Sequence, residues 1–385
     1  MTADSLLAAL AADEVALLEA LGPGIRRLDA LRAAYLAGEL GGTRNCVRGA
    51  IAPVDEAQFV DLRRPEALSH TADAALVELG AAAVRAGHVG LVVLNGGMAT
   101  RFGGVVKGVL PVDEAHSFLG LKLADALRVA QHVGVEPPVV VLMNSRATTG
   151  PTLAHLEAND YFGYPPERVW MFEQQWSVRL ETSGAVYREA SGAASFYGPG
   201  HGDLVECIGR SGLLQRFIDR GGRTLLMSNV DNVPATLDLR LLGHHLRAGV
   251  DASVELVDKR PGDAGGAPAL VDGRPQIIEA FRLPESFDPA RLPVFNTNTL
   301  WLQASALERA HPLTWFAVEK RVDDQTVIQF ERLVGELTAF VSTQWLRVCR
   351  EGPETRFVPV KHPDDLGAQR DELLTAWQAH APPSA

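Results

Sequence analysis

The sequence predicts an α/β fold in which a mixed sheet follows a helical N-terminal extension. Three observations support this fold class. The first 88 residues are dominated by helical patterns. From Gly90 onward, short apolar, β-branched runs alternate with amphipathic helices, which is the pattern of strands that are buried on both faces. The dipeptide Asp272-Gly273 lies between two apolar runs and predicts a β-hairpin, which adds antiparallel pairing.

The helical extension is expected to cover residues 1–88. Apolar residues recur there at helical spacing in three stretches, and breaks such as Gly22-Pro23 separate them. The expected helices lie at residues 4–21, 24–38 and 71–86.

A larger domain is expected at residues 89–366, followed by a C-terminal helix and tail at 367–385. It begins with the apolar run at 91–95, and the helix after it starts at its cap Ser117 and ends at Gly134. Further strands are expected at 138–143, 169–172, 224–227, 252–258, 294–303 and 356–360. Further helices are expected at 204–220 with Asp203 as the cap, at 236–249, at 328–340 and at 364–380.

The composition excludes several classes of function. The net charge of −11 repels polyanions, so we expect no nucleic-acid partner. No apolar run approaches the roughly 18 residues of a membrane span, and the acidic N-terminus lacks the basic region of a secretory signal. We therefore expect a cytoplasmic protein without a membrane partner. The three cysteines have neither disulfide nor zinc-site spacing.

Lysine is scarce in this sequence. Only five of the 36 Lys and Arg residues are lysines. A compact ammonium suits positions where a planar guanidinium does not fit, although the small number is equally compatible with chance. These residues are Lys107, Lys122, Lys259, Lys320 and Lys361.

A glycine-rich turn at residues 95–104 follows the first expected strand of the larger domain. Its glycines let backbone N–H groups approach a ligand, and Arg101 and Lys107 add the positive charge that a triphosphate requires. The turn has neither the GxGxxG spacing of dinucleotide-binding folds nor the GK[ST] of a Walker loop. On these residues alone it is either a phosphate-binding loop or a plain turn.

Asp231 follows the expected strand at 224–227 by four residues. This places it at the carboxyl end of a strand, where open α/β sheets bind ligands. Mg²⁺ suits such a site, because it takes one or two carboxylates and completes its shell with phosphate oxygens and water. A lone aspartate there is also compatible with a cap or a turn, so both interpretations stay open.

Eight segments, taken in order, resemble the UDP-sugar pyrophosphorylases typified by the eukaryotic-type UTP–glucose-1-phosphate uridylyltransferase. The turn NGGMATRFGGVVKG is similar to the LxGGxGTxxG…PK signature of that family. The other seven segments are MNS at 143–145, FEQQ at 172–175, GPGHGD at 198–203, LMSNVDN at 226–232, VDK at 257–259, FNTNTLW at 295–301 and TRFVPVKHPDDL at 355–366. Three of the five lysines fall at lysine positions of these motifs, which argues against chance.

The resemblance implies a three-layer, mixed-sheet nucleotidyltransferase domain that is Rossmann-like and similar to the glycosyltransferase-A fold. It implies a reaction of UTP with a sugar 1-phosphate, with glucose 1-phosphate first, and Mg²⁺ as the cofactor. Typical members continue into a C-terminal β-helix, whereas this sequence stops at residue 385. We therefore expect no β-helix and a monomer or a weak homo-oligomer.

The resemblance also implies roles for single residues. The expected catalytic cations are Arg101, Lys107 and Lys361. The expected nucleotide-binding residues are Asn95, Gly96, Gly97, Gln174 and Gly200, with Gln174 reading the uracil edge. The expected sugar-phosphate contacts are His201, Glu279, Asn296, Asn298 and Lys259. The expected metal ligand is Asp231.

Three departures from the family pattern bear on these roles. Ala99 stands where the family usually has Gly, and no proline precedes Lys107, which affects the geometry of the turn. Thr299 replaces an Asn in the motif at 295–301, which affects the sugar contacts. The alternatives are the same reaction on N-acetylglucosamine 1-phosphate, galactose 1-phosphate or a cyclitol phosphate or with another nucleoside triphosphate, a nucleotide-binding oxidoreductase, and a non-catalytic nucleotide sensor.

Overall fold

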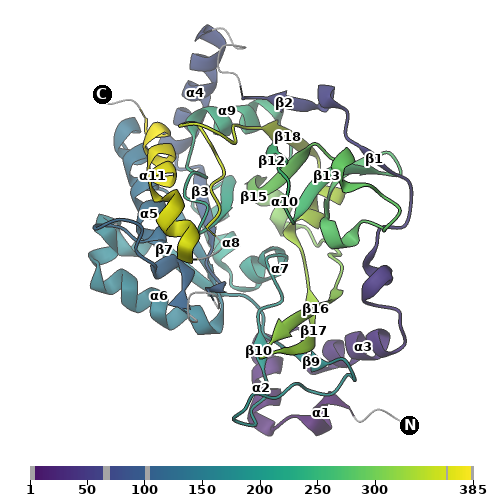
Figure 1. Ribbon diagram of the computed structural model, residues 1–385. Coiled ribbons are helices and arrows are strands. Elements are labelled where there is room, and N and C mark those ends of the chain that lie inside the picture. The colour runs from purple at the N-terminus through teal and green to yellow at the C-terminus, as the bar shows by residue number, and fades with distance from the viewer. Residues whose placement is uncertain (1–4, 64–69, 100–104, 361–362, 383–385) are drawn as a thin grey trace.

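A computed structural model describes residues 5–63, 70–99, 105–360 and 363–382 (Figure 1). The helices are α1 (Leu6–Ala9), α2 (Ala12–Leu21), α3 (Ile25–Leu36), α4 (His70–Arg85), α5 (Phe118–Val133), α6 (Arg146–Ala158), α7 (Asp203–Arg210), α8 (Leu213–Asp219), α9 (Leu239–Ala248), α10 (Ala304–Glu308) and α11 (Pro363–Ala379). The strands are β1 (Ile51–Pro53), β2 (Phe59–Asp61), β3 (Val89–Leu94), β4 (Met98–Ala99), β5 (Val105–Val106), β6 (Val139–Asn144), β7 (Val169–Glu173), β8 (Ser177–Val178), β9 (Leu180–Glu181), β10 (Phe196–Tyr197), β11 (Thr224–Asn229), β12 (Ala252–Asp258), β13 (Gly266–Val271), β14 (Arg274–Glu279), β15 (Val294–Gln303), β16 (Phe316–Val322), β17 (Gln325–Glu331) and β18 (Thr343–Arg347).

The central sheet has eight strands in the order β2-β18-β12-β15-β11-β3-β6-β7. β15 runs antiparallel to its neighbours β11 and β12, and the other neighbouring pairs are parallel. The hairpin expected at Asp272-Gly273 joins β13 to β14, and both turn residues have a positive φ, of 48° and 80°. The mixed α/β sheet that the sequence predicts is confirmed.

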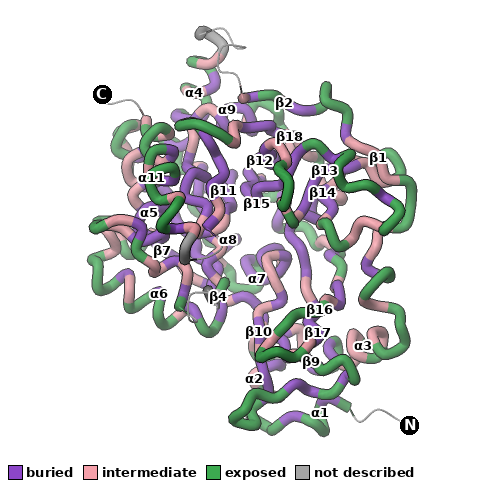
Figure 2. Tube along the Cα trace, in the orientation of Figure 1, coloured by how far each residue is buried: buried purple, intermediate pink, exposed green. Residues whose placement is uncertain are grey.

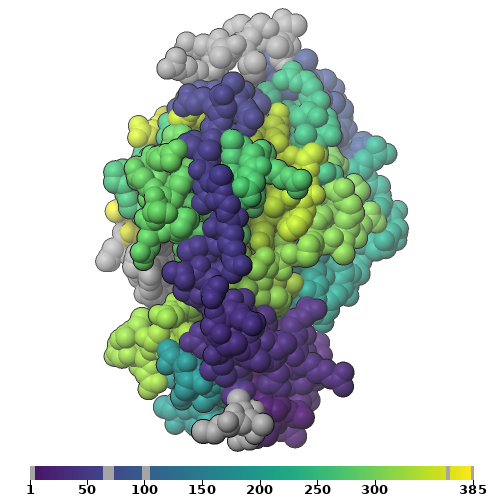
Figure 3. All heavy atoms as spheres, turned by 90° about the vertical axis from the view of Figure 1, so that its right-hand side faces the viewer, coloured from purple at the N-terminus to yellow at the C-terminus, as the bar shows by residue number. Residues whose placement is uncertain are grey.

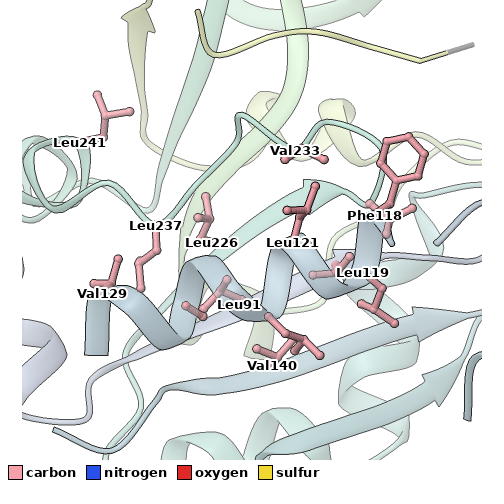
Figure 4. Close-up of a cluster of buried hydrophobic side chains, with 14 of the residues drawn as sticks. Leu91, Phe118, Leu119, Leu121, Val129, Val140, Leu226, Val233, Leu237 and Leu241 are labelled. Atoms are coloured by element: carbon pink, nitrogen blue, oxygen red, sulfur yellow. The ribbon is translucent and has the colours of Figure 1, made fainter. Parts of the chain in front are cut away.

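Helices cover both faces of the central sheet, which makes three layers. Alternate residues of β3 point to opposite faces: Leu91 belongs to one buried apolar cluster and Val92 to the other. On the first face, Phe118, Leu119, Leu121 and Val129 of α5 belong to the same buried cluster as Leu91, Val140 and Leu226 of the strands (Figure 4). α4, α9 and α11 contribute to the same cluster, and α7, α8 and α10 cover the second face. The buried residues accordingly concentrate in the strands (Figure 2).

The described residues of the expected extension, 1–88, are distributed over three parts of the molecule. α1, α2 and α3 pack on the small sheet β16-β17-β9 and form a separate apolar cluster. β1 and β2, which the sequence analysis did not anticipate, pair with β13 and β18. The segment that holds them runs along one side of the molecule from the N-terminal helices toward α4 (Figure 3). α4 itself packs against α9 on the central sheet.

Several expected elements differ from the structure. The helix expected at 4–21 is interrupted between α1 and α2, and the one at 204–220 is interrupted at Gly212, which has a φ of 73°. Residues 328–340 do not form an α-helix, because β17 extends to Glu331 and a 3₁₀ helix follows at Val334–Ala339. Residues 356–360 are not part of a strand. Among the described residues, no helix combines the length and apolar character needed to cross a bilayer.

Candidate functional site

Two hollows open at the carboxyl ends of the parallel strands. The larger one, of about 540 Å³, is lined by residues that follow β3, β6, β7 and β11. The smaller one, of about 250 Å³, lies beside it and is lined by residues 295–298 of β15, residues 264–266, Glu279 at the end of β14, Phe357 and Pro359, and residues at and after the end of β11. The two hollows share His201, Asn229 and Asp231. This is the edge of the sheet where open α/β folds bind ligands.

The glycine-rich turn forms one wall of the larger hollow. Gly96 and Gly97 line it, as the sequence predicts for nucleotide-binding residues. Asn95 does not line either hollow: its buried side chain donates from Nδ2 to Asn144 Oδ1 at 2.8 Å and to Thr152 Oγ1 at 2.9 Å. Asn95 therefore supports the turn from behind. Arg101 lies outside the described residues.

The amide of Gln174 lies between two glycines in the larger hollow. A Cβ atom at Gly96 would lie 2.7 Å from Gln174 Nε2, and a Cβ atom at Gly198 would lie 2.0 Å from it. Gln174 is 8% exposed, and its backbone N–H donates to the carbonyl of Asn144 at 2.7 Å. The glycines thus leave room for an amide whose donor and acceptor can read a flat polar edge.

Gly200 and His201 belong to a loop that is clamped by Arg332. Gly200 has a φ of 98°, and a Cβ atom there would lie 2.9 Å from Arg332 O. The backbone of Arg332 exchanges hydrogen bonds with Pro199 and Gly202, and its side chain pairs with buried Asp203. Asp203 therefore holds the loop rather than capping α7, whose N-cap is Gly202.

His201 presents one ring nitrogen to the protein. Its Nδ1 accepts a hydrogen bond from the backbone N–H of Val334 at 2.9 Å. Burial lowers the pKa of His201 to about 4, so the ring is neutral near pH 7. Because Nδ1 is the acceptor, the proton lies on Nε2, and His201 is a neutral donor between the two hollows.

Lys107 and Asp231 form an ion pair at the edge of the larger hollow. Lys107 Nζ lies 2.7 Å from Asp231 Oδ2 and donates to the carbonyl of Val360 at 2.8 Å. Val360 immediately precedes Lys361, which lies outside the described residues. The chain thus brings together two of the expected charged groups from segments more than 120 residues apart.

The donor set at Asp231 fits a metal that is shared with phosphate oxygens. Among the residues that the structure describes, no three His, Cys, Asp or Glu side chains gather as a complete protein site. Mg²⁺ does not need one, because it commonly takes one or two carboxylates together with substrate phosphates and water. The Asp231 side chain is 16% exposed and lines both hollows, so its oxygens can be reached from either.

The smaller hollow contains Glu279, Asn296 and Asn298. Burial raises the pKa of Glu279 to about 7. A bulge in β15 places Asn298 at a φ of 59°, and its Nδ2 donates to Asn229 Oδ1 at 2.9 Å. Asn298 Oδ1 is buried without a partner, and so remains available as an acceptor.

Thr299 and Lys259 both lie in the family motifs, but neither lines a hollow. Thr299, the departure from the family motif, does not line the smaller hollow: its hydroxyl is buried and accepts from Asn232 Nδ2 at 3.4 Å. Lys259 does not line either hollow, because its ammonium donates to the carbonyl of Pro289 at 3.0 Å. The structure therefore does not bring Lys259 to the other expected contacts.

The sequence analysis missed several residues of the site. Trp176, Arg179 and Gly198 line the larger hollow, and Asn229 lines both. Gly198 and Asn229 stand inside the quoted motifs, so their neighbours could have indicated them. Trp176 and Arg179 follow β7 on a segment with no regular pattern, and only the fold brings them to the hollow.

The family model described as UTP–glucose-1-phosphate uridylyltransferase matches residues 39–380. The enzyme of that name from Saccharomyces cerevisiae is 30% identical over 307 residues, which cover 73% of this chain and 59% of the relative. The one from Encephalitozoon cuniculi is 28% identical over 286 residues, covering 71% and 56%. The chain thus spans less than two thirds of the length of these relatives.

Solved structures show the same fold. A UDP-glucose pyrophosphorylase mutant from Leishmania major aligns with a TM-score of 0.71 and 25% identity, covering 95% of this chain and 79% of that one. The uridine diphosphate N-acetylglucosamine pyrophosphorylase from Trypanosoma brucei aligns with a TM-score of 0.77 at 20% identity, covering 93% and 78%. With the family match over most of its length, the chain belongs to the UTP–glucose-1-phosphate uridylyltransferase family.

Proposed function

We propose that the protein transfers the uridylyl group of UTP to glucose 1-phosphate and releases pyrophosphate. The observation that carries this proposal is the shared boundary of the two hollows at His201, Asn229 and Asp231. A nucleotide in the larger hollow and a sugar phosphate in the smaller one would meet with their phosphates at this boundary. Family membership supports the same assignment.

The chemistry requires positioning more than proton transfer. An oxygen of the sugar phosphate attacks the α-phosphorus of UTP, a new P–O bond forms, and the bond from that phosphorus to the β-bridging oxygen breaks. Pyrophosphate leaves with the electron pair of the broken bond. The second pKa of such a phosphate is roughly 6, so the attacking oxygen is already ionised near pH 7. In-line placement and stabilisation of negative charge then carry the reaction.

Each group of the site has a part in this proposal. Gln174, Gly96, Gly97 and Gly200 hold the nucleotide, with the Gln174 amide on the uracil edge. His201 donates from Nε2 to the sugar phosphate. Glu279, Asn296 and Asn298 bind sugar hydroxyls.

The charged groups stabilise the phosphates. Lys107 contacts the phosphates of UTP, and Arg101 and Lys361 add positive charge. Asp231 would hold Mg²⁺, and the ion when bound neutralises charge that develops on the α-phosphate and the leaving pyrophosphate.

A direct test measures pyrophosphate release with the four nucleoside triphosphates and a panel of sugar 1-phosphates. We expect UTP and glucose 1-phosphate to give the highest kcat/KM. We expect Asp231→Asn to lower the metal-dependent rate by a factor of about 100 or more, because the metal loses its carboxylate.

Asp219→Asn is the matched control for this substitution. Asp219 lies at the end of α8, and its carboxylate accepts from Gln215 away from both hollows. An unchanged rate in Asp231→Asn, with circular dichroism showing an intact fold, would contradict the metal role. A cytoplasmic location and a monomeric or weakly associated state stay predictions from the sequence.

A further inference from the structure

Lys122 is a buried lysine that the reaction scheme does not use. It lies on α5, is 2% exposed, and belongs to none of the motifs that resemble the family. Its ammonium donates three hydrogen bonds: to Ser228 Oγ at 3.1 Å, to the carbonyl of Asn232 at 2.6 Å and to the carbonyl of Ala235 at 2.9 Å. All three donors of this side chain are therefore occupied.

The three acceptors lie on both sides of Asp231 in the sequence. Segment 228–235 comprises the last two residues of β11 and the hydrogen-bonded turns that follow them, and α9 begins at Leu239. Ser228, Asn232 and Ala235 are 3%, 1% and 2% exposed, so water does not reach them readily. Removing the ammonium would leave buried oxygens without their donor, which is costly, and the segment would rearrange to satisfy them.

The geometry suits an ammonium and not a guanidinium. Three acceptors converge on one nitrogen at 2.6–3.1 Å, as a tetrahedral donor allows and a planar fork does not. This explains one of the two lysines outside the family motifs. The other, Lys320, lies on β16 and pairs with Glu331 at 3.1 Å.

Neighbouring groups hold Asn232 and the residues that follow the segment. Asn232 Nδ2 donates to the carbonyl of Arg356 at 3.1 Å, and Arg356 Nη1 donates to Thr236 Oγ1 at 2.7 Å. Asp125, one turn after Lys122 on α5, accepts from the backbone N–H of Leu237 at 2.7 Å. Of these groups, Lys122 is the one that joins both ends of the segment that carries Asp231.

We propose that Lys122 is a positioning residue for Asp231: it fixes the path of segment 228–235 and thereby aims the carboxylate at the boundary of the two hollows. The inference rests on the proposed function, in which Asp231 holds the metal. It predicts that the ammonium acts on metal affinity through the backbone, without touching substrate or metal.

The test replaces Lys122 with methionine, which keeps the length of the side chain and removes its donors. Binding of Mn²⁺ in the presence of UTP is followed by electron paramagnetic resonance of the free ion, and the Mg²⁺ concentration for half-maximal rate is measured separately. We expect Lys122→Met to weaken Mn²⁺ binding about 10- to 100-fold, as loss of residues that orient a metal ligand commonly does. Ser228→Ala keeps the lysine, removes one acceptor and should weaken binding several-fold, which provides a milder variant if Lys122→Met does not fold.

Leu123→Ala is the matched control. Leu123 is the next residue of α5 and is fully buried, and its truncation leaves a cavity in the core without removing a hydrogen bond from segment 228–235. We expect it to lower the melting temperature and leave Mn²⁺ affinity unchanged. Equal weakening in Leu123→Ala and Lys122→Met, or wild-type affinity in Lys122→Met, would overturn the inference. Asp231→Asn in the same assay separates the two proposals: if that variant binds Mn²⁺ as wild type does, the metal role itself fails.

Discussion

At the scale of single residues, the site depends on small side chains as much as on charged ones. Gly96 and Gly198 face the Gln174 amide so closely that a Cβ atom at either position would overlap it. Neither glycine has a positive φ, so the requirement at these positions is space and not backbone conformation. The larger hollow is therefore shaped in part by residues that contribute no functional group.

Gly198→Ala should displace the Gln174 amide and weaken binding of the nucleotide. A lost hydrogen bond in a buried site costs about 1–3 kcal/mol, so we expect the KM for UTP to rise roughly tenfold or more. Gly209→Ala on α7 is the control, because a Cβ atom there meets no atom within 4 Å. Steady-state kinetics in which both variants keep the wild-type KM would contradict this role of Gly198.

The site residues that could be predicted from the sequence are those that lie in a family motif and whose side chains also reach the hollow. Lys107, Gln174, His201 and Asp231 line the larger hollow as expected. Lys259 was expected from its motif, but its ammonium contacts the carbonyl of Pro289 instead. A motif fixes a position in the chain, whereas the direction of a long side chain depends on neighbours that are distant in sequence.

At the scale of elements, the close approach of α4 and α9 is a feature that the spacing of apolar residues does not predict. A Cβ atom at Gly80 of α4 would lie 2.1 Å from the carbonyl of Leu239, and one at Gly243 of α9 would lie 2.1 Å from the carbonyl of Leu76. Glycine has a low helix propensity, but at these two positions the absence of a side chain allows the two backbones to approach.

Gly243→Ala should push α4 and α9 apart and lower the free energy of unfolding by about 1–3 kcal/mol, because a packed interface resists added volume. Gly367→Ala on α11 meets no atom within 4 Å and should be neutral or stabilise by up to about 1 kcal/mol. Chemical denaturation followed by circular dichroism gives both values. A stable Gly243→Ala variant would show that the two helices can separate without cost.

The elements that the sequence predicts well are those with one clear period. The buried strands β3, β6 and β15 lie where their apolar runs indicate, and α5 has its expected cap at Ser117 and its end at Gly134. The expectation at 328–340 is wrong because Phe330, Leu333, Val334 and Leu337 stand at helical spacing although they belong to β17 and to the 3₁₀ helix after it, with Leu333 as its N-cap. Spacing alone does not separate strand from helix here, and the pairing of β17 with β16 and β9 decides it.

At the scale of the whole molecule, buried histidines make stability depend on pH. Burial lowers the pKa of His201, His244 and His245 from 6.5 to about 4. As the pH falls below about 6.5, the unfolded chain takes up protons that the folded chain cannot. The stability that these neutral rings provide is present above pH 6.5 and is lost as the pH falls toward 4.

His245→Gln should reduce this dependence on pH. His245 is fully buried, with Ser253 Oγ 2.9 Å from Nδ1 and Gln303 Nε2 3.2 Å from Nε2. The loss of unfolding free energy between pH 7 and pH 5 should be smaller by about 2 kcal/mol than in the wild type. His132→Gln changes an exposed histidine and should keep the wild-type profile. Parallel profiles for His245→Gln and wild type would contradict the assignment.

The ion pair between Lys107 and Asp231 bears on how charges are rearranged when substrates bind. The Lys107 ammonium lies 2.7 Å from the Asp231 carboxylate and is its counter-charge. In the proposed function, a cation bound by that carboxylate would release the ammonium, which lines the same hollow, to contact the phosphates. Substrate binding would then be an exchange of partners: the carboxylate passes from the ammonium to the cation, and the ammonium passes to the phosphate oxygens, so that neither group loses its partner of opposite charge.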